Sequence, residues 1–436
     1  MKSKFSVLSL LLLLLVSIQT ALASEPAEIL ARRAVSGNSV ESAAAIEELR
    51  SLGPAGLNTL LARYGDEIKR HIDDAKLKPD AEWQRITTAL DTVAGQKNSY
   101  ISGLYWYTDL KEAEKAARET GKPILSLRLL GKLTDELSCA NSRFFRTVLY
   151  ANAEVAAVLR DRFVLHWQTV RPVPVITIDF GDGRKIERTI TGNSIHYVLD
   201  TSGDPIEALP GLYGPQAFLR RLADAEGLFK SIAGKSGREK EIAQRSYYVV
   251  SNNQLSLAWV KDIASTGGKV PDYFTVDRGA NGEISAISIA ALAITKSGVE
   301  RNTLVAMMGV SQSLGRITSE AAWRKIASLH ASDAVLDRRS IALIRRQNPG
   351  LSDKEFAAMV QKFQDAIALD TVRNEYLMHP RLYAWLVQDP SRTNLEKFNE
   401  KVYAELFLTP KSDPWLGLLG PDVYTGIDNG GVTANR

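Results

Sequence analysis

Apolar and polar positions follow two different periods along the chain. From about residue 99 to residue 235, short apolar runs such as Ile124–Leu130 and Ile195–Leu199 are typical of buried strands, whereas Asp109–Thr120 and Gln216–Phe229 place apolar residues at helical spacing. Strands that alternate with helices predict an α/β sheet with crossover connections. The other expected elements here are a helix begun by Cys139, a helix over 152–160, a strand over 163–167, and a β-hairpin over 173–191 with a two-residue turn at Asp182-Gly183.

Helical spacing dominates on both sides of this segment. In residues 24–98, two runs rich in leucine and alanine are separated by Gly53-Pro54, which predicts a helical hairpin. The hairpin resembles one HEAT-type repeat. Because one repeat cannot bury its apolar face alone, a small helical cap packed on the rest of the protein is the simpler interpretation. Residues 236–436 are expected to be mostly helical, with helices near 284–296, 318–331, 353–368 and 393–408, and with an extended tail from Pro410.

The first residues have the pattern of an export signal. Lys2 and Lys4 precede the apolar run Phe5–Ile18, and Ala21-Leu22-Ala23 provides the small residues of a signal-peptidase site. The run is too short to cross a bilayer of about 30 Å as a helix. We therefore expect residues 1–23 to be a signal peptide, cleaved after Ala23, and the protein to be periplasmic or secreted. The alternative is an uncleaved N-terminal anchor.

Composition places the chain among ordinary globular proteins. With 436 residues, of which 45% are hydrophobic and 24% charged, it is long enough for two or three domains and does not belong to the disordered, collagen or coiled-coil classes. The net charge of +4 falls to about +2 without Lys2 and Lys4, so it does not indicate a nucleic-acid partner. The longest later apolar stretch, Ile284–Ile294, is too short to span a bilayer, and no integral membrane segment is expected in the mature chain.

The single cysteine, Cys139, cannot form an internal disulfide. An unpaired thiol in an exported protein is either buried and inert or retained for chemistry with a partner. At a helix N-terminus the sulfur would face free backbone N–H groups and the positive end of the helix dipole, which favour the thiolate. Arg143 and Arg146 would add to this field, and Ser142 would hydrogen-bond the sulfur.

The motifs around Cys139 resemble, in their order, those of exported thioredoxin-like domains. They are Trp106 ahead of a helix, Gly121-Lys122-Pro123 at the start of a strand, Cys139-Ala140-Asn141-Ser142, Glu154-Val155, Phe163-Val164, Val198-Leu199-Asp200 with Gly203, and Pro210-Gly211. The resemblance covers under a third of the chain. It implies a thioredoxin-like α/β domain over 99–235, flanked by the small N-terminal helical segment, which is HEAT-like, and by the mostly helical C-terminal region.

The same resemblance implies a function in thiol–disulfide or redox-linked chemistry. Cys139 would be the nucleophile, with Ser142 beside it, and would form a mixed disulfide with a protein client or a small thiol. No cofactor is implied. The supporting candidates are Arg143, Arg146, His166, Ser194 and His196.

The chain departs from the family pattern at three positions. Ser142 stands where the family has its second cysteine, and Ser138 stands where it usually has tryptophan. The family's cis-proline would fall near Asn193-Ser194, and this chain has no proline there. A dithiol mechanism is therefore excluded for the isolated chain, and the surface that normally aligns a substrate against the sulfur lacks its usual residue.

Two other functions stay open. The first is a non-catalytic scaffold or interaction protein of the cell envelope. The second is a Cys–His hydrolase, which needs His166 or His196 within hydrogen-bond reach of the sulfur, although a histidine on a strand is more often a core residue. The five histidines lack the short spacing of zinc sites, and the acidic turn near Asp179 lacks the ligand series of a calcium loop, so no metal is expected.

The C-terminal half contains a segment dense in polar and aromatic residues, Arg373–Trp385, and a second near Trp415 and Asp422-Val423-Tyr424. Such residues are common at interfaces and pockets. Helix–helix packing, with the polar ends of the side chains at the surface, is the more frequent explanation. The sequence leaves open whether these segments form an interface or pocket or pack between helices.

Overall fold

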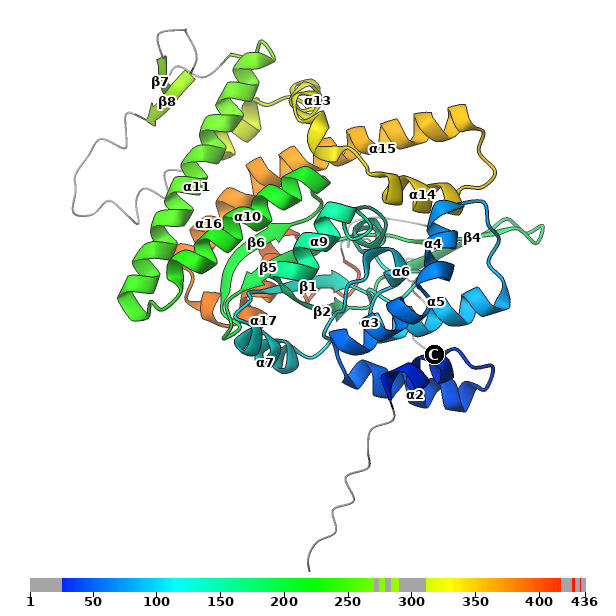
Figure 1. The fold of residues 1–436 in the computed structure, drawn as a ribbon. Helices are drawn as coiled ribbons and strands as arrows, with labels where there is room; N and C mark the ends of the chain where they lie inside the picture. Colours follow the sequence, from blue (N-terminus) through cyan, green and yellow to red (C-terminus); the bar gives the residue numbers. More distant parts are fainter. Residues whose placement is uncertain are drawn as a thin grey trace, which may run out of the picture.

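The computed structural model describes residues 26–269, 274–278, 284–289, 311–416, 426–427 and 432. A small mixed sheet lies at the centre of these residues and helices surround it (Figure 1). The expected signal peptide lies outside the described residues, as do residues 290–296 and Asp422-Val423-Tyr424.

The central sheet has four strands in the order β2-β1-β5-β6. Strand β1 (Ile124–Leu130) pairs in parallel with β2 (Val164–Arg171) and antiparallel with β5 (Ser194–Leu199), and β6 (Pro205–Pro210) completes the sheet antiparallel to β5. All seven residues of β1 are buried, because strands flank it on both sides and helices cover its faces. The expected strands over 124–130 and 195–199 are therefore confirmed.

Helices connect and flank these strands. Between β1 and β2 the chain forms α8 (Ala140–Phe144), the π-helical turn η1 (Phe145–Leu149) and α9 (Ala153–Arg162), and α10 (Pro215–Ile232) follows β6. Helix α7 (Leu110–Thr120) precedes β1. It begins where the Asp109 side chain accepts two backbone N–H bonds, and it ends at Gly121, which adopts φ +68°.

The hairpin expected over 173–191 is present, but its turn differs from the expectation. Strands β3 (Val175–Asp179) and β4 (Lys185–Thr189) pair antiparallel. The Phe180 N–H donates to the Arg184 carbonyl at 3.1 Å, which leaves three residues in the turn rather than two. Gly181 and Gly183, with φ of +75° and +91°, permit this longer turn. After β4 the chain returns across the start of α8.

The N-terminal segment is a separate helical layer. It contains α1 (Ala27–Ala34), α2 (Ser39–Ser51), α3 (Pro54–Arg63), α4 (Gly65–Asp73), α5 (Ala81–Ala94) and α6 (Ser99–Ser102). The predicted hairpin is α2–α3, with Gly53 at φ +64° between the helices. These helices form a second apolar cluster, which Ala151 and Leu343 also join. They attach to the sheet through polar contacts such as Trp167 Nε1, which donates to the Gly95 carbonyl at 2.8 Å.

The described residues of the C-terminal half are mostly helical, as expected, except for one pair of strands. Its elements are α11 (Gly237–Ser265), β7 (Phe274–Arg278), β8 (Ile284–Ile289), α13 (Glu320–Leu329), η3 (Ala331–Ala334), α14 (Arg338–Gln347), α15 (Asp353–Arg373), η4 (Asn374–Met378), α16 (His379–Gln388), η5 (Pro390–Thr393), α17 (Leu395–Lys401) and η6 (Val402–Leu406). The helix expected near 284–296 is wrong for residues 284–289, where Ile-Ser-Ala-Ile-Ser-Ile pairs as a strand with β7.

One continuous apolar core joins the sheet to the C-terminal helices. Gly214, which precedes α10, lies directly against η3, and its N–H donates to Thr371 Oγ1 in α15 at 2.8 Å. Nearby, Arg220 forms a bidentate pair with Asp333 at 2.7 and 2.6 Å. The C-terminal helices are therefore anchored on α10 rather than attached by a linker.

Replacing Gly214 by alanine tests this close approach. A Cβ at that position would lie 2.2 Å from the Asp333 carbonyl oxygen, so Gly214→Ala is expected to lower the free energy of unfolding by about 1–3 kcal/mol. Gly227→Ala, inside α10, is the control, because a Cβ there meets nothing within 4 Å and should stabilise the helix by about 0.5–1 kcal/mol. Chemical denaturation measures both, and equal effects would contradict the packing described.

Glu207 in β6 is a buried carboxyl between the sheet and two C-terminal helices. Its Oε2 accepts hydrogen bonds from Tyr247 of α11 at 2.7 Å and Tyr383 of α16 at 3.1 Å. The His379 Nε2 lies 3.9 Å from its other oxygen and donates to the Ala208 carbonyl. Burial raises the pKa of Glu207 to about 7, although the Ala208 N–H, the two tyrosines and the Arg221 charge lower it.

This raised pKa predicts a loss of stability with rising pH. The folded state holds the Glu207 proton more tightly than the unfolded chain, so its contribution is complete below about pH 4.5 and is lost as pH rises through about 7. Relative to Glu207→Gln, the wild-type protein should lose about 3 kcal/mol of unfolding free energy between about pH 5 and pH 8. Denaturant titrations across this range measure the difference, and Glu239→Gln on the exposed face of α11 is the control. Parallel pH profiles for wild type and Glu207→Gln would refute the prediction.

Candidate functional site

Cys139 lies immediately before α8, at the position expected from the sequence. Its backbone is extended (φ −60°, ψ 160°), and its Sγ accepts a hydrogen bond from the Ser142 N–H at 3.4 Å. The Cys139 N–H donates to the Leu130 carbonyl at the end of β1. The sulfur therefore takes the place of a helix-capping oxygen.

The thiol is completely buried, and this overturns the expected activation. Burial raises the pKa of Cys139, although hydrogen bonds from the Ser142, Leu130 and Asn141 amides and the Arg143 charge act in the opposite direction. The free amides at the start of α8 favour the thiolate, but the loss of water is the larger effect. The sulfur is held as a neutral thiol.

The loop between β4 and β5 covers the start of α8. Thr189 Oγ1 donates to the Ser138 carbonyl at 3.1 Å, and Asn141 Nδ2 donates to Ser194 Oγ at 2.7 Å. Between them, Gly192 lies so close that a Cβ would meet Asn141 Oδ1 at 3.0 Å and Ala140 Cβ at 3.2 Å. Polar contacts on both sides of the cysteine thus hold the loop in place.

The C-terminal segment forms a second layer over this loop. Tyr403 of η6 donates to the Asn193 carbonyl at 3.0 Å, and Asn193 Nδ2 donates to Thr409 Oγ1 at 3.3 Å. Arg171, at the end of β2, donates to the Thr409 carbonyl at 2.7 Å. The surface where a substrate was expected, around Asn193-Ser194, is therefore occupied by the chain's own C-terminal part.

The other predicted site residues support the structure around the cysteine. The Ser142 hydroxyl is buried without a hydrogen-bond partner in the described part of the chain, and only its backbone N–H reaches the sulfur. Arg143 Nη1 donates to the Ser138 carbonyl at 2.6 Å and to Thr189 Oγ1. Arg146, which is 3% exposed, donates to the carbonyls of Leu133, Asp135 and Glu136. The two arginines fix the loop over 131–138.

His166 and His196 are core residues. His166 Nδ1 hydrogen-bonds Ser126 Oγ at 2.9 Å, and His196 Nε2 hydrogen-bonds the Tyr150 hydroxyl at 2.7 Å. Burial lowers the pKa of His196 to about 3, and burial together with the Arg128 charge lowers that of His166 to about 3. Among the described residues neither imidazole hydrogen-bonds Cys139, so the Cys–His pair needed by a hydrolase is missing from this geometry.

The aromatic segment of the C-terminal half packs between helices. Tyr376 stacks on Trp259 with ring centroids 5.3 Å apart, and Tyr383 stacks on His379 at 5.2 Å. All four side chains are buried. The packing interpretation is confirmed for these residues.

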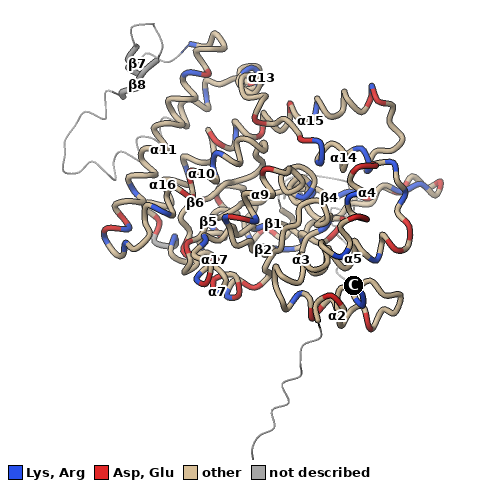
Figure 2. The backbone as a smooth tube through the Cα atoms, viewed as in Figure 1, with Lys and Arg blue, Asp and Glu red and all other residues tan. Residues whose placement is uncertain are grey.

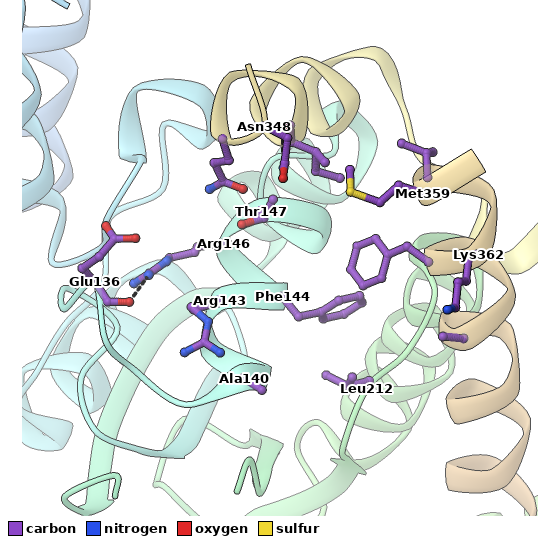
Figure 3. A pocket seen from close by; sticks show the side chains of 15 residues that line it. Glu136, Ala140, Arg143, Phe144, Arg146, Thr147, Leu212, Asn348, Met359 and Lys362 are labelled. Atoms are coloured by element: carbon purple, nitrogen blue, oxygen red, sulfur yellow. Dashed lines mark hydrogen bonds between the residues drawn. The ribbon is translucent and has the colours of Figure 1, made fainter. Parts of the chain in front are cut away.

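An open pocket of about 870 Å³ lies beside the covered cysteine, between α8–η1 on one side and α14–α15 on the other (Figure 3). Its walls are mostly apolar, and charged groups stand at its edges. The lining residues are Glu136, Ala140, Arg143, Phe144, Arg146, Thr147, Leu212, Ile344, Gln347, Asn348, Met359, Val360, Lys362, Phe363 and Ala366.

Sequence reasoning found Arg143 and Arg146 but missed the rest of this pocket. Met359 and Phe363 lie one turn apart on α15, and such spacing is read as an ordinary core stripe. Only the position of α15 across from α8 gives these residues a shared cavity.

In the described residues, no three His, Cys, Asp or Glu side chains gather in a way that would hold a metal ion. None of the helices described is both long enough and apolar enough to pass through a membrane. Comparison of the chain with protein-family models, curated proteins and solved structures gives no match.

The burial of Cys139 predicts that its thiol reacts slowly while the protein is folded. Reaction with a chromogenic disulfide reagent should be at least about a hundredfold slower in the native protein than in denaturant, because the sulfur reacts only when the structure opens. The double variant Cys139→Ala/Ser202→Cys is the control, since Ser202 is exposed in the same domain and should react fast while the protein is folded. Native labelling of Cys139 at the rate of that control would contradict the covered site.

Proposed function

We propose that this chain is a non-catalytic binding protein of the cell envelope, in which a thioredoxin-like unit is the scaffold for a ligand pocket. The sheet order β2-β1-β5-β6, with a helix after β1 and another after β6, supports the thioredoxin-like part. The cysteine at the start of the helix that follows β1 agrees with it.

One observation carries the proposal: the sulfur is covered, while the next turn of the same helix is open. Cys139 has no exposed surface, and Ala140, Arg143 and Phe144 line the pocket. A monothiol redox protein needs its sulfur to reach a partner, and both the β4–β5 loop and the Tyr403–Thr409 segment stand in the way. Pockets of this size and apolar character are typical ligand sites.

The pattern of residues 1–23 supports export to the periplasm or beyond. Basic and acidic positions are interspersed along the helices in Figure 2 rather than gathered on one broad face. This distribution suits a small ligand or a protein partner better than a polyanion.

A neutral apolar dye tests the pocket directly. N-phenylnaphthylamine should fluoresce on binding to the wild-type protein and to Cys139→Ala, because binding does not need the thiol. Ala366→Trp should weaken the signal, because Ala366 lines the pocket from α15 and the indole would occupy part of the cavity. Ala357→Trp is the control, since Ala357 is exposed on the same helix and does not line the pocket.

The proposal fails if Ala366→Trp and Ala357→Trp bind the dye equally well. It also fails if the protein reduces insulin disulfides with dithiothreitol and Cys139→Ala does not, because the thiol would then be catalytic.

A further inference from the structure

We propose that the pocket between α8–η1 and α14–α15 binds a free single-chain carboxylate, such as a fatty acid, with the carboxylate at Arg143 and the alkyl chain running toward α15. This inference rests on the proposed binding function and names its ligand class.

The pocket has a polar side and an apolar side. In Figure 3, Arg143, Arg146 and Glu136 stand together on one side, and Met359 stands across the cavity on α15 with Lys362 at the outer edge of that wall. Phe144 lies between them. An amphipathic ligand is favoured with its charged group at the two arginines, because placing that group against Met359 and Phe363 would bury it among apolar side chains.

The charges at the pocket favour an anion. Three cations line it, Arg143, Arg146 and Lys362, against one carboxylate, Glu136. Glu136 already pairs with Lys97, whose Nζ lies 3.0 Å from its Oε2. Arg143 and Arg146 also lie near enough to Glu136 for their charges to lower its pKa, but one carboxylate shared among these cations leaves the lining with a surplus of positive charge.

Arg143 is the pocket cation that keeps N–H donors available for a ligand. Both of its hydrogen bonds come from Nη1 and end on neutral oxygens, those of Ser138 and Thr189. Nη2 and Nε have no partner in the described part of the chain, and the side chain is only partly buried. A guanidinium held at one end and free at the other presents two N–H groups to a carboxylate.

The walls suit an alkyl chain better than a peptide. An extended peptide brings an N–H and a carbonyl at every residue, and each needs a partner once water is removed. On α15, Met359, Val360 and Phe363 offer none, and the polar side chains of that wall are limited to Gln347, Asn348 and Lys362. An alkyl chain needs none, and removing its methylenes from water favours binding.

Three probes with the same chain and different head groups test the charge preference: decanoate, decanol and decyltrimethylammonium. Each is titrated below its aggregation threshold against the protein loaded with N-phenylnaphthylamine, and dye displacement gives the Kd. Decanoate should bind at least about tenfold more tightly than decanol, and the cation should bind most weakly. Raising the salt concentration should reduce the advantage of decanoate.

Variants assign the preference to the pocket cations. Arg143→Met should weaken decanoate about tenfold and leave decanol unchanged, and Arg143→Lys should restore part of the difference. Decanol also reports whether the pocket is intact, because its binding needs the cavity and no charge. Lys362→Gln, on the exposed side of α15, should weaken decanoate by a smaller factor, and Lys354→Gln on the same helix away from the pocket should not.

If Arg143→Met also stops binding decanol, the substitution has damaged the pocket. The carboxylate inference is then tested by the head-group series on the wild-type protein and by Lys362→Gln. Equal Kd values for decanoate and decanol overturn the carboxylate inference, and the proposed binding function still stands if the dye binds and Ala366→Trp weakens its binding. Failure of the dye to bind at all overturns both.

Discussion

The structure around the candidate site depends on one constraint, the removal of water from the start of α8. Thr189 and Ser194 bind the residues on either side of Cys139, and Gly192 packs directly on Ala140 and Asn141. Free amides at a helix start favour a thiolate, but here desolvation is the larger effect and keeps the sulfur neutral. The part of the helix that a ligand can reach is consequently the turn after Cys139, which lines the pocket.

That next turn becomes a pocket only because the C-terminal helices share a core with the sheet. Gly214 and Thr371, together with the Arg220–Asp333 pair, hold η3 and α15 against α10, and α14 and α15 then form the wall opposite Phe144. The same packing buries Glu207 among tyrosines and a histidine. This burial raises the pKa of the carboxyl and so disfavours its ionised form. Stability and the cavity therefore rest on the same contacts between the two halves.

On the polar side of the pocket, hydrogen bonds to backbone carbonyls hold both arginines in place. Arg146 donates to three carbonyls of the loop over 131–138, and Arg143 connects the same loop to β4 through Ser138 and Thr189. Guanidinium groups suit this role, because their several fixed N–H donors can hold protein and still face a ligand. The positive charge is thus positioned before any ligand arrives, which reduces the ordering cost of binding.

The sequence alone determined the features that depend on neighbouring residues. The buried strand Ile124–Leu130, the helix bounded by Asp109 and Gly121, and the helix start at Cys139 follow from local periodicity and capping, and all three are found. Only the tertiary structure decided whether the sulfur is exposed, because the residues that cover it reach as far as Tyr403 and Thr409. It also decided that residues 284–289 pair as a strand, and that Met359 and Phe363 face a cavity. Periodicity shows that a side chain is apolar, but burial, desolvation and pocket shape depend on which distant segment packs against it.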